Sequence, residues 1–172
     1  MSPKTLLLLR HATAEPSRPG HRDLDRRLSA DGLAEARGVG EDLRAQGVRV
    51  DHVLCSAAVR TRQTLEQLRL IGDPGVDVRL DLYLGGTADI LELVSSVVAS
   101  TLLVVGHAPS VPGAVHELAD PQASAAAALA AVTDRFPPAT LARLDLPAGA
   151  GPGAGVLVEV RLPDSARGLY HR

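Results

Sequence analysis

Four ionisable side chains stand at or just beyond the ends of short apolar runs in this chain of 172 residues. They are two arginines and two histidines, namely Arg10, His11, Arg60 and His107. Two guanidinium groups, each with a planar fork of donors, suit a dianion such as phosphate. Two imidazoles add a nucleophile or an acid–base group that titrates near neutral pH. Each residue taken alone fits a solvated loop or a satisfied core histidine, but the four together predict phosphate chemistry if the fold gathers them.

The apolar runs themselves predict where these side chains lie. Residues 5–9 and 101–105 are almost wholly apolar, which is typical of strands buried on both faces of a sheet, and residues 50–56 predict a third strand. A ligand of an open α/β sheet binds outside the carboxyl ends of the strands. Because all four side chains follow or closely trail such ends, we expect them in one pocket at that edge of the sheet.

Strand-like and helix-like segments alternate through two-thirds of the chain. Helical spacing of apolar residues extends from an N-cap at Ser29 to a stop at Gly47. Two more predicted helices cover 58–70 and, with Thr87 as the cap, residues up to 98, and a short alternating strand over 76–80 separates them. This alternation predicts a three-layer, doubly wound α/β fold with a mainly parallel sheet flanked by helices.

The last third of the chain is less regular. Its predicted elements are a helix over 110–118, an alanine-rich helix over 123–132, and a hairpin whose strands cover 140–146 and 156–162. Alanine supplies little core volume, so the role of the alanine-rich helix stays open. We expect one domain over 1–163, because a chain of this length fits a single core, and a flexible polar tail over 164–172.

Composition excludes several classes of function. The net charge of −2, with two Tyr, one Phe and no Trp, offers neither a basic field nor a stacking platform for nucleic acid. A single lysine, Lys4, excludes a P-loop, and a single cysteine excludes a disulfide framework or a multi-cysteine zinc site. The uncharged stretch 93–106 is shorter than the ~18 apolar residues of a membrane span, and the apolar start breaks at Arg10. We therefore expect a cytoplasmic protein with no nucleic-acid or membrane partner.

Four blocks, in order along residues 6–118, resemble the histidine phosphatase superfamily and, within it, the short phosphohistidine phosphatase (SixA-like) branch. They are an Arg-His-Ala block at 9–16, a block at 25–32, a Ser-x-x-x-Arg-Thr-x-x-Thr block at 56–64 and a Val-Gly-His block at 104–109. In the second block, Asp25 begins the match to the family pattern Asp-x-x-Arg-Pro-Leu-Thr-x-x-Gly, and Arg27 replaces its proline. The resemblance implies a phosphoglycerate mutase-like fold.

The resemblance also implies a role for each of the four side chains. His11 would be the nucleophile that takes the phosphoryl group, and Arg10, Arg60 and a protonated His107 would hold the phosphate oxygens. Water would then hydrolyse the phosphohistidine intermediate on the enzyme. Because side-chain cations would supply the positive charge, the expectation is a phosphatase that needs neither a metal ion nor another cofactor.

One departure from the family bears on the substrate. Larger members that cleave phosphate esters carry a glutamate after the third strand, and Leu84 stands at the corresponding position here. The nearest acid is Asp81, which we interpret as a surface turn residue. A phosphohistidine leaves as imidazole and needs a general acid less than an ester does, and the chain lacks long insertions that would cap the pocket. The sequence therefore favours a phosphohistidine-bearing protein as the partner.

Two alternative functions stay open. One is a phosphomonoesterase or mutase that acts on a small phosphate ester, for which Asp81 would have to face the phosphate. The other is a non-catalytic phosphate-binding module, against which the intact nucleophile His11 argues.

Other candidate residues carry weaker signals. Four residues separate Cys55 from Arg60, where a cysteine-dependent phosphatase needs five, so we interpret Cys55 as a small buried hydrophobe. His116 and Glu117 lack the second histidine of a zinc-binding helix. The first loop contains arginines that are either a solvated cluster or a rim for an acidic or phosphorylated partner, namely Arg18, Arg22 and Arg26.

Overall fold

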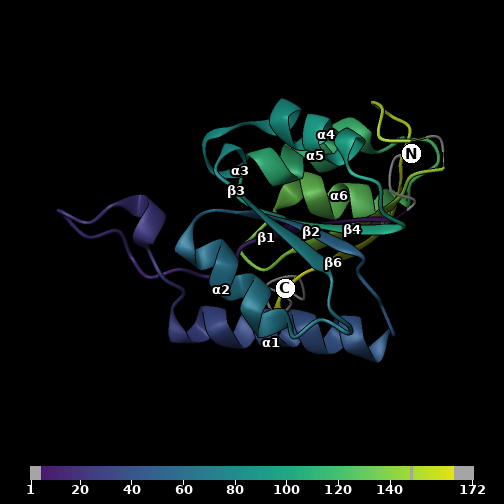
Figure 1. Cartoon of the computed structure of the whole chain (residues 1–172). Helices are drawn as coiled ribbons and strands as arrows, with labels where there is room; N and C mark the ends of the chain where they lie inside the picture. The colour runs from purple at the N-terminus through teal and green to yellow at the C-terminus, as the bar shows by residue number, and fades with distance from the viewer. Residues whose placement is uncertain (1–4, 148, 165–172) are drawn as a thin grey trace.

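The apolar runs predicted as strands form one six-stranded sheet with helices on both faces (Figure 1). The computed structural model describes residues 5–147 and 149–164. The strands are β1 (Thr5–Arg10), β2 (His52–Ser56), β3 (Gly75–Arg79), β4 (Thr101–Gly106), β5 (Leu141–Asp145) and β6 (Val156–Arg161). The helices are α1 (Ala30–Ala45), α2 (Val59–Leu68), α3 (Asp81–Leu84), α4 (Thr87–Ser96), α5 (Ser110–Leu118) and α6 (Ala126–Asp134), with a short 3₁₀ helix η1 (Asp23–Asp25).

The strands lie in the order β3-β2-β4-β1-β5-β6. Strands β3, β2, β4 and β1 run parallel. Strand β5 pairs antiparallel with β1 and with β6, so the hairpin predicted from the last third of the sequence is present. Arg10 lies opposite Gly106, and Cys55 lies opposite Val105. The carboxyl ends of β1, β2 and β4 therefore stand side by side. A mainly parallel, doubly wound α/β sheet is confirmed.

The alternation of side chains along each strand divides the core into two layers. On β1, Leu6 and Leu8 pack with residues of α4, α5 and α6, while Leu7 and Leu9 pack with residues of α1 and α2. Figure 1 shows α1 and α2 on one face of the sheet and α4, α5 and α6 on the other. Because helices cover both faces of the sheet, its buried strands are apolar at nearly every position and do not alternate between apolar and polar residues.

Helix α1 begins as predicted. The hydroxyl oxygen of Ser29 accepts a hydrogen bond from the N–H of Gly32 at 3.1 Å, which satisfies one of the free donors of the first turn. Gly47 follows the helix with a φ of 67°, in the left-handed region where glycine has no steric cost.

Two other helix boundaries differ from the predictions. The N-cap of α4 is Gly86, whose N–H donates to the carboxylate of Asp89 at 2.8 Å, and Thr87 is already helical. Helix α2 ends at Leu68 because Arg69 adopts a left-handed conformation with a φ of 47°. Both ends depend on local backbone geometry that the spacing of apolar residues does not encode.

The last third of the chain completes the sheet and its second helical layer. The alanine-rich segment forms α6, which contributes Ala128 and Val132 to the core. The predicted tail 164–172 lies outside the described residues from position 165 onward. Among the described helices, none is long and apolar enough to cross a membrane.

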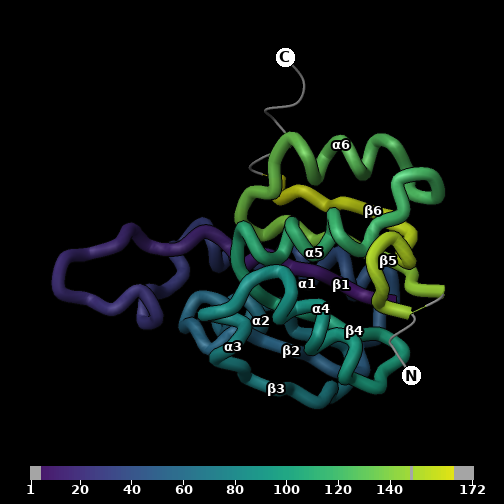
Figure 2. The backbone as a smooth tube through the Cα atoms, turned by 90° about the horizontal axis from the view of Figure 1, so that it is seen from above, coloured from purple at the N-terminus to yellow at the C-terminus, as the bar shows by residue number. Residues whose placement is uncertain are grey.

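The segment that joins β1 to α1, residues 15–27, projects away from the body of the molecule (Figures 1 and 2). We call it the β1–α1 loop. A bridge between Ala14 and Leu28 closes its base. The polar composition of 15–27, with its prolines and glycine, predicts a loop, and within that loop Asp23–Asp25 form the helical turn η1.

Candidate functional site

The carboxyl ends of β1 and β4, with the start of α2, border a pocket of about 600 Å³. The structure brings all four side chains singled out from the sequence to its wall, namely Arg10, His11, Arg60 and His107. Further lining residues are Thr13, Ala14, Asp23, Arg26, Tyr83, Leu84, Ala108 and Pro138. Arg60 is only 4% exposed and His11 only 7%, so packing restrains both side chains.

The hydrogen-bond partner of His11 determines which ring nitrogen carries the proton. Nδ1 lies 2.7 Å from the carbonyl oxygen of Ala12, and a carbonyl can only accept, so Nδ1 is protonated. Nε2 keeps its lone pair, toward which Arg60 donates its Nε–H at 3.3 Å. Burial lowers the pKa of His11 to about 3, against the opposing effect of the Ala12 hydrogen bond. The ring is therefore neutral at pH 7 and can attack an electrophile through Nε2.

His107 lies beside His11, with the ring centroids 5.2 Å apart. Its Nε2 is 2.7 Å from Oγ of Ser56, and its Nδ1 is 3.4 Å from Nη2 of Arg60. Because an arginine can only donate, Nδ1 bears the lone pair and Nε2 the hydrogen. Burial, and then the charge of Arg60, lower the pKa of His107 to about 4. Without a bound anion, His107 is therefore a neutral ring at pH 7. A bound phosphate dianion would raise its pKa, so the protonated His107 expected from the sequence stays a prediction for the phosphate-bound pocket.

Arg10 is the last residue of β1 and supplies a second guanidinium to the pocket. Its Nη1 donates to the carbonyl oxygen of Phe136 at 2.7 Å, which ties it to the segment before β5. Burial lowers the pKa of Arg10, but an arginine stays charged at neutral pH. Arg10 and Arg60 therefore give the pocket two permanent positive charges.

Asp23, from the β1–α1 loop, binds Arg60 from the loop side. Nη1 of Arg60 donates to the carbonyl oxygen of Asp23 at 2.8 Å, and Nη2 donates to the carboxylate at 2.9 Å. Arg26 and Tyr83 donate to the same carboxylate, each at 3.1 Å. Burial would raise the pKa of Asp23, but the charge and hydrogen bond of Arg60 lower it overall. Asp23 is therefore ionised at neutral pH.

The guanidinium of Arg60 contacts two sets of partners. Asp23 binds it on one side. On the other side, Nε lies 3.3 Å from Nε2 of His11, and Nη2 lies 3.4 Å from Nδ1 of His107. Because the guanidinium is planar and rigid, fixing one side orients the other. The guanidinium is therefore held with its Nε–H and Nη2 directed at the two histidines, where it supplies a positive charge beside both rings.

Sequence reasoning missed Asp23 and Tyr83. A signal for Asp23 existed, because the family pattern Asp-x-x-Arg, counted back from Arg26, places its aspartate at Asp23 and not at Asp25. The match that begins at Asp25 is therefore wrong: Asp25 pairs with the exposed Arg22 at 2.8 Å and does not line the phosphate pocket. No pattern points to Tyr83, which meets Asp23 across 60 positions of sequence.

Asp81, the nearest acid in the sequence, does not line the pocket, whereas Leu84 does. The carboxylate of Asp81 accepts two hydrogen bonds from Arg79, at 2.5 and 3.1 Å, and one from the N–H of Leu82 at 3.0 Å. These hydrogen bonds, with that of Arg79 first, lower the pKa of Asp81. Asp81 is thus a partly exposed residue at the start of α3, not the turn residue expected from the sequence, and it lies outside the pocket that Leu84 lines.

The remaining candidates lie outside this chemistry. Cys55 is buried, and burial raises the pKa of its thiol to about 12, so it is not a thiolate nucleophile at neutral pH. In residues 5–147 and 149–164, no three His, Cys, Asp or Glu side chains group together as metal ligands would.

Comparisons with known proteins agree with this geometry. A family model described as histidine phosphatase superfamily (branch 1) matches residues 6–82. Two uncharacterized proteins from strains of Mycobacterium tuberculosis, MT1313 and Rv1276c, are each 35% identical over 161 residues, which cover 90% of this chain and 99% of the relative.

Solved structures extend the similarity to the fold. A proposed phosphohistidine phosphatase SixA from Nakamurella multipartitia is 36% identical with a TM-score of 0.76, over 94% of this chain and 96% of its own. A second one, from Agrobacterium tumefaciens, is 28% identical with a TM-score of 0.81, over 94% and 99%. A phosphoglycerate mutase from Plasmodium falciparum, 19% identical with a TM-score of 0.57 over 93% and 94%, shares the fold alone.

Proposed function

The chain belongs to the histidine phosphatase superfamily, in its SixA-like branch, and from that premise we propose that it hydrolyses phosphohistidine on a protein. The single observation that carries the proposal is the state of His11. Its Nδ1–H is taken by the carbonyl of Ala12, and its Nε2 lone pair lies in a pocket with two arginines. This is the arrangement that a nitrogen nucleophile for a phosphoryl group requires.

In the first step, Nε2 of His11 attacks the phosphorus of the substrate in line with the bond that breaks. Arg10 and Arg60 bind the phosphoryl oxygens and hold the phosphorus beside Nε2. A new P–N bond forms as the old one breaks, and its electron pair stays on the leaving ring nitrogen. When the other ring nitrogen of the substrate carries a hydrogen, the ring leaves as neutral imidazole and needs no further acid.

In the second step, water attacks the phosphorus of phosphorylated His11. The electron pair of the P–N bond returns to Nε2, while Nδ1–H stays hydrogen-bonded to Ala12. Both hydrogens of the water remain on the product, which leaves as dihydrogen phosphate. A dianion beside His107 favours protonation of that ring at Nδ1, which adds a further donor to the phosphoryl oxygens. In this proposal side-chain cations carry the electrostatic stabilisation.

The pocket supports a P–N bond as the substrate bond more than an ester bond. Of the described residues that line it, Asp23 is the carboxylate, and it is ionised and bound to Arg60 and Arg26. An ionised carboxylate cannot donate a proton to an alkoxide. Leu84, which the sequence aligns with the glutamate of ester-cleaving family members, lines the pocket and cannot donate a proton.

Trapping of the intermediate tests this proposal. The enzyme is mixed with a peptide whose phosphohistidine carries radioactive phosphate, and the reaction is quenched in base. We expect a labelled enzyme whose label is stable in base and labile in acid, as phosphoramidates are. His11→Ala should carry no label and have no turnover while still binding inorganic phosphate, because the arginines remain. Label on the His11→Ala protein, or a base-labile intermediate, would place the nucleophile elsewhere.

A further inference from the structure

The β1–α1 loop extends beyond the pocket and has an exposed outer part. Figures 1 and 2 show it reaching away from the sheet and its helices. The N–H of Glu15 donates to the carbonyl of Arg27 at 2.8 Å, which holds the two ends of the loop together. All residues over 16–22 are exposed. Pro16 and Pro19 restrict the backbone there, so the outer part has fewer conformations than an ordinary loop of this length.

The inner end of the loop is joined to the phosphate site. Asp23 and Arg26 line the pocket, and Asp23 binds Arg60 through both its carbonyl and its carboxylate. Tyr83 adds a third attachment from α3. A contact made on the outer part of the loop is therefore connected by one rigid turn, η1, to the guanidinium that faces His11.

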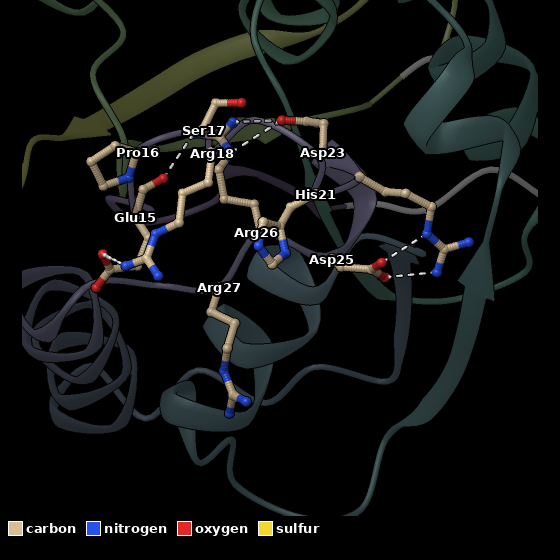
Figure 3. A pocket seen from close by; sticks show the side chains of 10 residues that line it. Glu15, Pro16, Ser17, Arg18, His21, Asp23, Asp25, Arg26 and Arg27 are labelled. Carbon is tan, nitrogen blue, oxygen red and sulfur yellow. Dashed lines mark hydrogen bonds and ion pairs between the residues drawn. The ribbon is translucent and has the colours of Figure 1, made fainter.

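The outer part offers positive charges that can change partner. Arg18 lies 3.9 Å from Glu15, and Arg22 lies 2.8 Å from Asp25, with 71% and 76% of the two arginine side chains exposed. Water screens exposed ion pairs of this kind and leaves them weak, so carboxylates of a partner can replace those of the loop. Side chains of residues 15–27 line a small hollow within the loop, and the exposed Arg27 points away from the others (Figure 3).

The placement of these arginines argues for a partner larger than the phosphorylated side chain. Arg18 and Arg22 do not line the phosphate pocket, so a phosphoryl group bound there does not account for them. The whole chain has a net charge of −2 and would weakly repel an acidic protein. Residues 15–27 carry four arginines against three carboxylates, so the loop has a net positive charge that offsets that repulsion beside the pocket.

We propose that the β1–α1 loop is a docking surface for acidic side chains that neighbour the phosphohistidine in the substrate protein, with Arg18 and Arg22 as its contacts. This inference rests on the proposed function and names the feature by which the enzyme distinguishes protein-borne from free phosphohistidine.

Two synthetic peptides of equal length test the docking surface, each with one phosphohistidine flanked by either four glutamates or four lysines. We expect the glutamate peptide to have at least a tenfold higher kcat/KM, mainly through a lower KM, and the difference to shrink as salt is added. In Arg18→Glu/Arg22→Glu the preference should disappear or reverse, while kcat/KM for free phosphohistidine stays within twofold. The matched control, Arg49→Glu/Arg69→Glu, makes the same change in net charge. Both positions are exposed, and they lie just before β2 and just after α2, at the ends of these elements that face away from the pocket.

Binding of the same peptides to the His11→Ala protein, measured by fluorescence anisotropy, separates the two proposals. If peptides are not hydrolysed but the glutamate peptide still binds more tightly and the loop variant loses this preference, the docking surface stands and the proposed function fails. If both peptides are hydrolysed and the loop variant keeps the preference of the unaltered protein, the docking surface is wrong and the function stands. An equal loss in the Arg49→Glu/Arg69→Glu control would also overturn the docking surface, because net charge alone would then explain the effect.

Discussion

At the scale of single residues, the chemistry of the pocket depends on the hydrogen-bond partners of two histidines. The carbonyl of Ala12 places the proton of His11 on Nδ1, and Arg60 places the lone pair of His107 on Nδ1. The two nitrogens that carry lone pairs, Nε2 of His11 and Nδ1 of His107, thus both face Arg60. Since burial lowers both pKa values, both rings are neutral when a phosphate arrives.

Asp23 gives a prediction at this scale. Asp23→Ala should lower kcat for free phosphohistidine by about 10–100-fold with a smaller change in KM, because Arg60 loses the carboxylate that orients it in the transition state. Asp23→Asn keeps an oxygen acceptor and should lose less than Asp23→Ala. Steady-state kinetics check this, with Asp25→Asn as the control, since Asp25 pairs with Arg22 outside the pocket. Equal losses in Asp23→Asn and Asp25→Asn would contradict an orienting role for Asp23.

Asp81 gives the prediction that concerns the substrate bond. A positioned general acid contributes about 10²–10⁴-fold, so Asp81→Asn should change phosphohistidine hydrolysis less than tenfold, because Asp81 lies outside the pocket. Phosphoramidates and activated aryl phosphates should react, while alkyl phosphates should barely react. Rates across a leaving-group series measure this. Equal turnover of alkyl phosphates and phosphohistidine, with both destroyed in Asp81→Asn, would support a phosphomonoesterase instead.

At the scale of elements, α1 approaches its neighbours so closely that two of its glycines leave no room for a side chain. A Cβ on Gly40 would overlap the carbonyl oxygen of Leu68 at the end of α2, and a Cβ on Gly32 would overlap that of Thr13. Glycine lowers helix stability by about 1 kcal/mol relative to alanine, so the packing must outweigh this cost. The contact with Thr13 places the start of α1 directly against the segment that enters the β1–α1 loop.

Two alanine substitutions in α1 separate packing from helix propensity. Gly40→Ala should lower the free energy of unfolding by about 1–3 kcal/mol, because the added methyl group forces α1 and α2 apart. Gly38→Ala should leave it unchanged or raise it by up to about 1 kcal/mol, since its nearest neighbour is Nη2 of Arg161 at 3.6 Å. Urea unfolding of the two variants measures both effects. A Gly40→Ala protein as stable as the Gly38→Ala protein would show that α1 can shift without cost.

At the scale of the whole molecule, the pocket couples stability to pH. Folding buries His11 and His107 as neutral rings with pKa values of about 3 and about 4, whereas in an unfolded chain histidine has a pKa of about 6.5. Between pH 7 and pH 4 the unfolded state therefore binds protons that the folded state does not. Stability is fully retained above about pH 6.5 and is lost as the pH falls toward the folded pKa values.

From pH 7 to pH 5 the free energy of unfolding should fall by about 1–2 kcal/mol for each of these two histidines. Urea unfolding at pH 7, 6 and 5 measures the decrease. His107→Gln removes one of the two titrating rings and should reduce the decrease by about half. Stability that is unchanged or higher at pH 5 in the unaltered protein would contradict neutral burial of the two rings.

The sequence by itself determined which runs form the parallel strands and that four pocket residues stand at or just beyond their carboxyl ends. Continuous apolar runs predict strands buried on both faces, and Arg10, His11 and His107 stand where two of those runs stop, so the carboxyl edge follows from local pattern and chain order. Only the tertiary structure decided that Asp23 binds Arg60 across 37 positions and that Tyr83 joins them. It also decided that His107 is neutral at pH 7, because burial and the neighbouring arginine set its pKa. Buried positions recur at regular spacing and can be recognised in the sequence. The partners of a loop side chain depend instead on contacts between residues far apart in the chain, and such contacts produce no regular spacing.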